Sequence, residues 1–108
     1  MNPSASAPHS HFASFADFYP YYLSEHRNPM CRRLHFIGTG LVLALLLATI
    51  VTGNPWLLLA LPVAGYSFAW VGHFFFEKNR PATFTHPLYS LLADFVLFRD
   101  IVAGRIRF

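Results

Sequence analysis

Histidine is the residue type in this sequence with the clearest capacity for chemistry near neutral pH, because a neutral imidazole binds metals and exchanges protons. Two of the six histidines, His9 and His11, fall in a short segment rich in Ser, Ala and Pro, where we expect exposed side chains. Glu77 follows His73 at the i+4 spacing, which places both side chains on one side of a helix. Four histidines outside that first segment are the candidate metal ligands: His26, His35, His73 and His86.

The composition indicates that these groups belong to a small membrane protein. Of 108 residues, 55% are hydrophobic and only 12% are charged, against about a quarter in an ordinary soluble domain. No Asp, Glu, Lys or Arg occurs in residues 34–76. These features exclude intrinsic disorder, a domain with a charged surface and a nucleic-acid binder of the usual basic kind. The single cysteine, Cys31, excludes a disulfide framework within one chain.

The charge-free segment is too long for one membrane-spanning helix of about 20 residues and suits two. Residues 52–55 (Thr-Gly-Asn-Pro) mark the break, because Gly and Asn favour a helix end and Pro favours a helix start. We therefore predict an all-α fold, a transmembrane hairpin with helices over about residues 34–51 and 55–76. A signal peptide explains the first segment less well, because the apolar run begins far from the first residue and has no small-residue cleavage site.

Interfacial amphipathic helices are predicted on both sides of this hairpin. Residues 12–25 place aromatic side chains at helical spacing, and Pro20 must kink this segment or start a helix. Residues 87–103 follow a helix start at Pro87 and are too short and too polar to span. Their apolar stripe consists of Leu88, Leu91, Leu92, Phe95, Phe98 and Val102. We expect a flexible tail over residues 1–11 and a single membrane domain over residues 12–108.

Positive charges predict the orientation. They cluster before the first expected span and after the second, whereas the connecting turn carries no charge. The positive-inside rule then places both termini in the cytoplasm. We expect an integral protein of the bacterial inner membrane, or of the endoplasmic reticulum in a eukaryote. The flanking cations are Arg27, Arg32, Arg33, Lys78 and Arg80.

The hairpin brings the candidate histidines together. His35 and His73 each lie 19 residues from Asn54 in the turn. At about 1.5 Å per residue, both rings lie about 28 Å from the turn, at one boundary of the hydrocarbon. The other two candidates must remain on the same side, so four imidazoles are expected at one face of the membrane. Small residues that allow the helices to pack closely are Gly38, Gly65, Ala69 and Gly72.

This set of residues favours a metal site, although a single histidine at a membrane boundary is more often an anchor. Neutral imidazoles with one carboxylate suit non-haem Fe(II) and leave open positions for substrate and oxygen. Two alternatives remain open. His35 and His73 are candidate axial ligands of a b-type haem, and the protein is alternatively a non-catalytic membrane adaptor.

Two separated blocks of sequence resemble a known family. The first is His26-Arg27-Asn28-Pro29, followed by His35 and Gly38. The second is Trp70-Val71-Gly72-His73, followed by Glu77-Lys78 and Pro81-Ala82. Together they resemble the small membrane proteins that include the fungal endoplasmic-reticulum 2-hydroxy fatty acid dioxygenase, formerly a domain of unknown function. The resemblance covers about residues 18–92, and the chain is more similar to the compact bacterial members.

The resemblance implies an Fe(II)-dependent dioxygenase that shortens 2-hydroxy fatty acids, such as 2-hydroxypalmitate, by one carbon through α-oxidation. It implies His26, His35 and His73 as the iron ligands and Glu77 as the motif's acid. His86 falls outside the shared blocks and ranks below the others. Asn28 is a candidate to orient a ligand or the substrate.

A 2-hydroxy acid is a sensible substrate for such a site, because its carboxylate and hydroxyl can chelate Fe(II) while its tail stays in lipid. Guanidinium groups suit a carboxylate, and the candidates are Arg32, Arg33 and Arg80. The expected partners are O2, a fatty-acyl substrate and the membrane, without nucleic acid. Two helices enclose a site poorly, so a homodimer is a further candidate arrangement.

Overall fold

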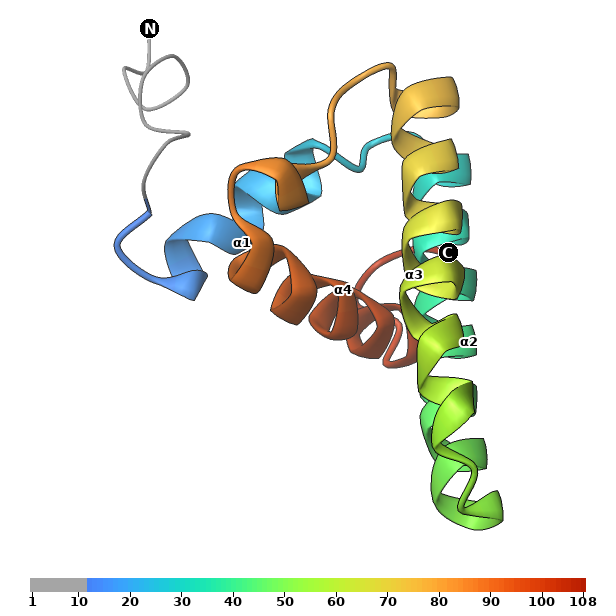
Figure 1. Ribbon diagram of the computed structural model, residues 1–108. Helices are drawn as coiled ribbons and strands as arrows, with labels where there is room; N and C mark the ends of the chain where they lie inside the picture. Colours follow the sequence, from blue (N-terminus) through green and yellow to red (C-terminus); the bar gives the residue numbers. More distant parts are fainter. Residues whose placement is uncertain (1–11) are drawn as a thin grey trace, which may run out of the picture.

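The computed structural model describes residues 12–108, and the predicted tail over residues 1–11 lies outside the described residues. Two long antiparallel helical segments lie side by side (Figure 1). Helix α4 (Pro87–Val102) packs against the first of them, α2 (Pro29–Thr52), and α1 (Phe15–Ser24) packs against α4. All regular secondary structure in residues 12–108 is helical, and these residues contain no strand. The elements are α1 (Phe15–Ser24), α2 (Pro29–Thr52), η3 (Pro55–Leu59), α3 (Ala60–Val71), η4 (Gly72–Glu77), η5 (Ala82–Phe84) and α4 (Pro87–Val102).

Helix α2 begins five residues before the predicted start and ends within a residue of the predicted end. It begins earlier because Asn28 caps it, with its side-chain oxygen accepting from the Met30 backbone N–H at 2.9 Å, and because Pro29 is preorganised for a first helical position. It ends where Gly53 takes a left-handed conformation (φ 70°), which a glycine adopts without strain. The predicted break between the two long segments is confirmed.

The second long segment is helical over Pro55–Glu77, but it changes type along its length. It starts as a 3₁₀ turn in η3, becomes α-helical in α3 and ends as a π-helix in η4. Both long segments are long and apolar enough to cross a membrane. Large apolar side chains are exposed on their outer surface, with Ile50 79%, Trp56 74% and Val51 73% exposed.

Glycines bring α2 and the second segment into close contact. A Cβ atom on Gly72 would lie 3.0 Å from Sγ and 3.2 Å from Cα of Cys31. A Cβ atom on Gly38 would lie 3.0 Å from Cβ of Phe68. Larger residues at these positions would push the backbones apart, so the expected close packing through small residues is confirmed.

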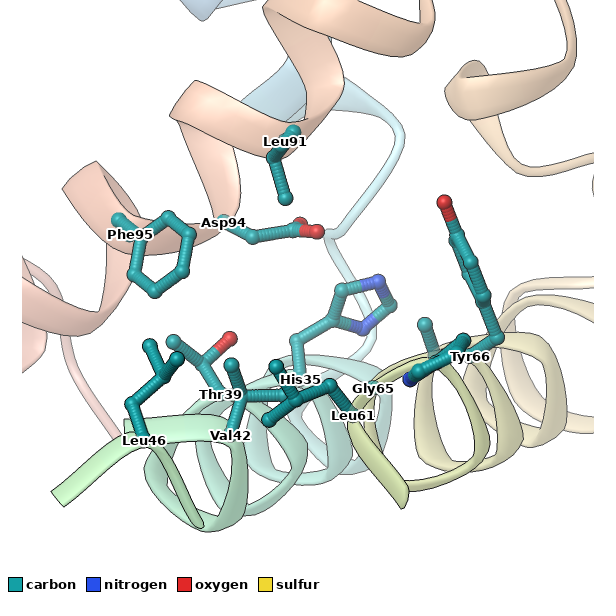
Figure 2. A pocket seen from close by; sticks show the side chains of 12 residues that line it. His35, Thr39, Val42, Leu46, Leu61, Gly65, Tyr66, Leu91, Asp94 and Phe95 are labelled. Atoms are coloured by element: carbon teal, nitrogen blue, oxygen red, sulfur yellow. The ribbon is translucent and has the colours of Figure 1, made fainter. Parts of the chain in front are cut away.

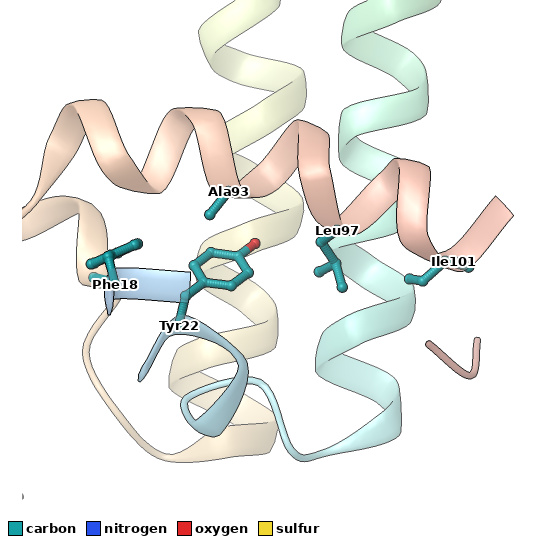
Figure 3. Packing of buried hydrophobic residues seen from close by; sticks show 6 residues of the cluster. Phe18, Tyr22, Ala93, Leu97 and Ile101 are labelled. Atoms are coloured by element: carbon teal, nitrogen blue, oxygen red, sulfur yellow. The ribbon is translucent and has the colours of Figure 1, made fainter. Parts of the chain in front are cut away.

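A hydrophobic core lies beside the helix pair, between α1 and α4. Phe18 and Tyr22 of α1 face Ala93, Leu97 and Ile101 of α4 (Figure 3). Phe18 and Tyr22 are therefore internal core residues, whereas the aromatic side chains of residues 12–25 were predicted to lie at the membrane interface. They are buried because α4 packs against α1, with the small Ala93 at 0% exposure in the same cluster.

The ends of α1 and α4 match the predicted interfacial segments to within a few residues, and Pro20 lies inside α1 without ending it. The predicted apolar stripe of α4 is divided between two environments. Leu88 and Val102 are 81% and 67% exposed, whereas the Phe98 ring stacks on Phe36 of α2 with centroids 4.5 Å apart. The inner face of α4 carries the polar Ser90 and Asp100 among apolar residues.

Candidate metal centre

Three of the candidate histidines meet in the interior. The ring centroids of His26 and His35 are 4.2 Å apart, those of His26 and His73 are 4.4 Å apart, and those of His35 and His73 are 4.8 Å apart. All three side chains are buried, at 1%, 5% and 1% exposure. They come from separate places in the chain: His26 from the loop between α1 and α2, His35 from α2, and His73 from η4.

Each imidazole is held through Nδ1 by an oxygen that can only accept. Nδ1 of His26 lies 2.6 Å from the Tyr22 carbonyl oxygen, and Nδ1 of His35 lies 2.9 Å from the Cys31 carbonyl oxygen. Nδ1 of His73 lies 2.7 Å from the side-chain oxygen of Asn79. Because the proton must therefore sit on Nδ1, Nε2 of each ring keeps its lone pair.

The Nε2 atoms of His26 and His35 are only 3.0 Å apart. With both protons on Nδ1, these atoms cannot hydrogen-bond to each other, and their lone pairs repel unless a cation lies near both. A shared proton is disfavoured, because burial lowers the pKa of His26 well below its usual value and the neighbouring His35 and His73 lower it further. Metal-bound histidines are typically fixed in this way by an acceptor behind the ring.

Cys31 joins this group, which we call the histidine cluster: His26, Cys31, His35 and His73. One ligand atom from each of these residues lies within 4.8 Å of the others, and all four residues are buried. Cys31 precedes His35 by one helical turn, and this i+4 spacing was the available sequence signal. Cys31 was not among the ligands predicted from the sequence, where its single occurrence served only to exclude a disulfide framework. Imidazoles with a thiol are a donor set that suits a transition metal.

Asn79 and Glu25 also support the site, although neither was identified from the sequence. The Asn79 amide donates to the Glu25 carbonyl oxygen at 3.1 Å and to Oε1 of Glu25 at 3.2 Å, so its oxygen faces His73. Lys78 ends the π-helix in a left-handed conformation (φ 64°) and turns the chain back, so that the Asn79 N–H donates to the His73 carbonyl oxygen at 3.1 Å. π-Helical turns are frequent at functional sites.

Glu77 and Asn28 contact each other. Both are close in sequence to residues of the histidine cluster, but neither belongs to its four potential metal ligands. The Asn28 backbone N–H donates to Oε2 of Glu77, and the Asn28 side chain donates to the Phe76 carbonyl oxygen at 3.3 Å. These contacts tie the start of α2 to the end of η4. Within the described chain, the structure thus gives both residues contacts that position the two elements carrying His35 and His73.

His86 also lies outside the histidine cluster. Its ring packs against Phe12 and Phe18, with centroids 5.1 Å and 5.4 Å away. Nδ1 of His86 lies 2.8 Å from Oγ1 of Thr85. Four imidazoles were expected to converge. Three of them do so, and His86 does not.

The three candidate arginines make other contacts. Arg32 donates to the carbonyl oxygens of His26 (3.1 Å), Arg27 (2.8 Å) and Arg107 (3.2 Å), which fastens the loop that carries His26. Arg33 lies over the ring of Phe108, and Arg80 lies over the ring of Phe84.

A small cavity of about 20 Å³ lies against the histidine cluster, large enough for about one water molecule. Helix α4 contributes Ser90 and Asp94 to its wall. Asp94 accepts from the Tyr22 hydroxyl at 2.6 Å, and Tyr22 in turn stacks on His26 at 4.0 Å between centroids. Burial raises the pKa of Asp94 to about 7, although the Tyr22 hydrogen bond opposes the shift.

A haem bound through His35 and His73 does not fit this geometry. Two axial ligands lie on opposite faces of the macrocycle, so its plane must pass between the two rings. The rings of His35 and His73 are in edge-to-face contact, with centroids 4.8 Å apart, and the ring of His26 touches both.

Comparison with known proteins adds one finding. A family model described as 2-hydroxy-palmitic acid dioxygenase Mpo1-like matches residues 12–106, which is nearly all of the chain. Neither the curated proteins nor the solved structures gave a match.

Proposed function

The chain belongs to the Mpo1-like family, and from this premise we propose that it is an Fe(II)-dependent dioxygenase acting on 2-hydroxy fatty acids. The observation that carries the proposal is the convergence of three buried imidazoles whose Nε2 lone pairs are kept free. A non-catalytic membrane adaptor needs no such arrangement. Burying three imidazoles close together lowers the stability of the fold unless they bind a ligand such as a metal ion.

His26, His35 and His73 would hold the iron through Nε2, with Cys31 beside them. Bound there, iron would supply Lewis acidity and the activation of oxygen. The overall reaction balances with O2 as the only co-reactant: a 2-hydroxy acid and O2 give a fatty acid one carbon shorter, CO2 and water. The C1–C2 bond breaks, the substrate loses four electrons and O2 gains them.

The remaining residues of the site orient the imidazoles, exclude water and hold the helices together. Asn79 and the carbonyl oxygens of Tyr22 and Cys31 fix the ring orientations, which raises the basicity of the ligands. The Tyr22 ring covers His26 and keeps water from that side. Glu77 and Asn28 hold η4 against the start of α2.

The proposal includes placement in a membrane, with α2 and the segment Pro55–Glu77 as the spans. Their exposed apolar side chains and the charge-free turn support this placement, and the exposed apolar side chains of α4, such as Leu88 and Val102, would lie in the interface. Both termini would then face the cytoplasm, in the inner membrane of a bacterium or the endoplasmic reticulum of a eukaryote. The substrate would enter from the lipid.

The test is metal content with turnover on the same samples. Detergent-purified, anaerobically handled protein is reconstituted with Fe(II), and iron per chain is measured by mass spectrometry together with the visible spectrum. Conversion of 2-hydroxyhexadecanoic acid to pentadecanoic acid is then measured under O2. We expect near-stoichiometric iron without a haem band, and formation of the shorter acid.

The matched variants separate the cluster from its surroundings. The His26→Ala, His35→Ala, His73→Ala triple variant should lose both iron and turnover, whereas His86→Ala should keep both. Removal of iron from the wild type with a chelator, followed by readdition, checks the same point without a change in sequence. A folded wild type that takes up no iron would overturn the proposal and favour the adaptor.

A further inference from the structure

A second, larger cavity lies between α2, α3 and α4. Its volume is about 310 Å³, at the lower end of the range for pockets that hold organic ligands. Figure 2 shows Asp94, Leu91 and Phe95 of α4 on one side of it, and side chains of α2 and α3 on the other. None of the functional assignments above uses this cavity.

The lining changes from polar to apolar along the cavity. On α2 the lining residues are His35, Thr39, Val42 and Leu46, which share one helix face. The polar end holds His35, Thr39 and Asp94, and the far end holds Val42, Leu46 and Leu61. A cavity with one polar end and one apolar end suits a ligand with a polar head and an apolar tail.

The dimensions distinguish an alkyl chain from a helix. From His35 to Leu46, α2 advances about 16 Å, which equals roughly a dozen extended methylene groups. A helix about 16 Å long and 10 Å across occupies about 1,200 Å³. The cavity, of about 310 Å³, has about a quarter of that volume. It can therefore enclose a single alkyl chain but not a helix from a second copy of the chain.

The cavity continues to the histidine cluster. It shares four lining residues with the small cavity there, including His35 and Asp94. The small cavity also holds Ser90, whose hydroxyl is buried, at 4% residue exposure, and has no hydrogen-bond partner within residues 12–108. A buried hydroxyl without a hydrogen-bond partner destabilises the fold, so a polar ligand group that meets it would recover that loss.

We propose that this cavity binds the tail of an unbranched 2-hydroxy fatty acid, whose polar head lies at the histidine cluster and meets the Ser90 hydroxyl. The inference rests on the proposed function for the nature of the head group, and it adds a tail site that measures chain length. Val42 lies about 10 Å from His35 along α2, roughly eight methylene groups, and Leu46 lies near the position of a twelfth.

Photolabelling of the wild-type protein is the first test, since it requires neither turnover nor a variant. The probes are 2-hydroxyhexadecanoic acids that carry a diazirine near C4 or near C13, with the labelled residues identified by mass spectrometry. The C4 probe should label Thr39 or Asp94, and the C13 probe should label Leu46 or Leu61. Excess unlabelled 2-hydroxyhexadecanoic acid should compete, whereas excess phosphatidylcholine should not.

Substitutions along one helix test the length measurement. Val42→Phe narrows the cavity and should reduce C13 labelling at least tenfold, with less than a twofold change in competition by 2-hydroxyoctanoic acid. Leu47→Phe is the matched control, because Leu47 is 62% exposed on the outer face of the same helix. Ser90→Ala should weaken competition by the 2-hydroxy acid several-fold and leave that of an alkane chain of equal length unchanged.

The outcomes are separable from those for the proposed function. Specific labelling without turnover supports the tail site and counts against the dioxygenase. Turnover combined with C13 labelling on Leu47, on Leu58 or across two copies would overturn the tail site alone. Equal competition by phosphatidylcholine would also overturn it, because the cavity would then be an ordinary contact with membrane lipid.

Discussion

Asn79 accepts a hydrogen bond from Nδ1 of His73 at 2.7 Å, and it is itself held by two oxygens of Glu25. The chain Glu25–Asn79–His73 connects the end of α1 to the π-helix that carries the third imidazole. It fixes both the tautomer and the direction of that ring, so metal binding by His73 would depend on a residue that is not itself a candidate ligand.

We predict that Asn79→Ala lowers affinity for Fe(II) by about 10- to 100-fold, the usual effect of losing the partner behind a metal-bound histidine. The measurement is competition with a chelator of known affinity under anaerobic conditions. Asn79→Asp keeps an acceptor for Nδ1 and should retain most of the affinity. Equal affinities of wild type and Asn79→Ala would contradict the role assigned to this hydrogen bond.

The second prediction concerns two glycines that differ in their surroundings. An added Cβ on Gly72 would meet the Cys31 backbone as well as its sulfur, whereas one on Gly40 would meet only the edge of the Phe98 ring, at 3.4 Å. Gly72→Ala should therefore separate α2 from η4, lower the melting temperature by about 5 °C or more and reduce iron content. Gly40→Ala should leave iron content unchanged and be neutral or stabilising, because Ala favours a helix by about 1 kcal/mol over Gly.

These two variants are compared by thermal melts monitored by circular dichroism and by metal analysis of the folded fraction. If Gly72→Ala behaved like Gly40→Ala in both measurements, the close approach of Gly72 to Cys31 would not control the site.

The juxtaposition of His35 and His73 could be predicted from the sequence because it depends on one number, the constant rise of a helix. Equal distances from the Gly53–Asn54 turn place the two residues at one level, and the structure has their rings in contact. The turn itself was predictable because Gly and Pro act locally on the backbone.

The parts that could not be predicted depend on where the chain goes after a helix ends. Asn79 reaches His73 only because Lys78 adopts a left-handed conformation, which no local pattern requires of a lysine. Ser90 and Asp94 reach the cluster because α4 packs through its smaller face, and periodicity alone defines the faces of a helix without showing which one is buried. The π-helix likewise leaves no mark in the spacing of apolar residues.

Lys78 carries the third prediction. A non-glycine residue at φ 64° costs roughly 1 kcal/mol, and a β-branched residue costs more. Lys78→Gly should therefore raise the melting temperature by a few degrees and keep iron binding, while Lys78→Val should lower the melting temperature and weaken the contact between Asn79 and His73. Thermal melts with metal analysis check both directions. Equal effects of Gly and Val would show that the lost lysine charge matters, and not the backbone conformation.

The fourth prediction is a pH dependence that arises from Asp94. Burial raises the pKa of this carboxyl group to about 7 in the folded protein, whereas an unfolded chain has a value of about 3.9. Between these values the folded state binds more protons than the unfolded state, so the contribution of Asp94 to stability falls as pH rises from about 4 to about 7. Asn at this position can still accept from the Tyr22 hydroxyl, but it does not ionise.

The melting temperature of Asp94→Asn minus that of the wild type should therefore increase from pH 4 to pH 7, by on the order of 5 °C, and then level off. Taking the difference removes the titration of the histidines, which both proteins share. Asp17→Asn is the control for the loss of a carboxylate, because Asp17 is an exposed side chain in the first turn of α1. A flat difference for Asp94→Asn would mean that Asp94 ionises normally, and the cavity wall beside His35 would then carry a full negative charge at neutral pH. Such a charge would oppose the binding of a carboxylate there, so this measurement also bears on how a 2-hydroxy acid can approach the cluster.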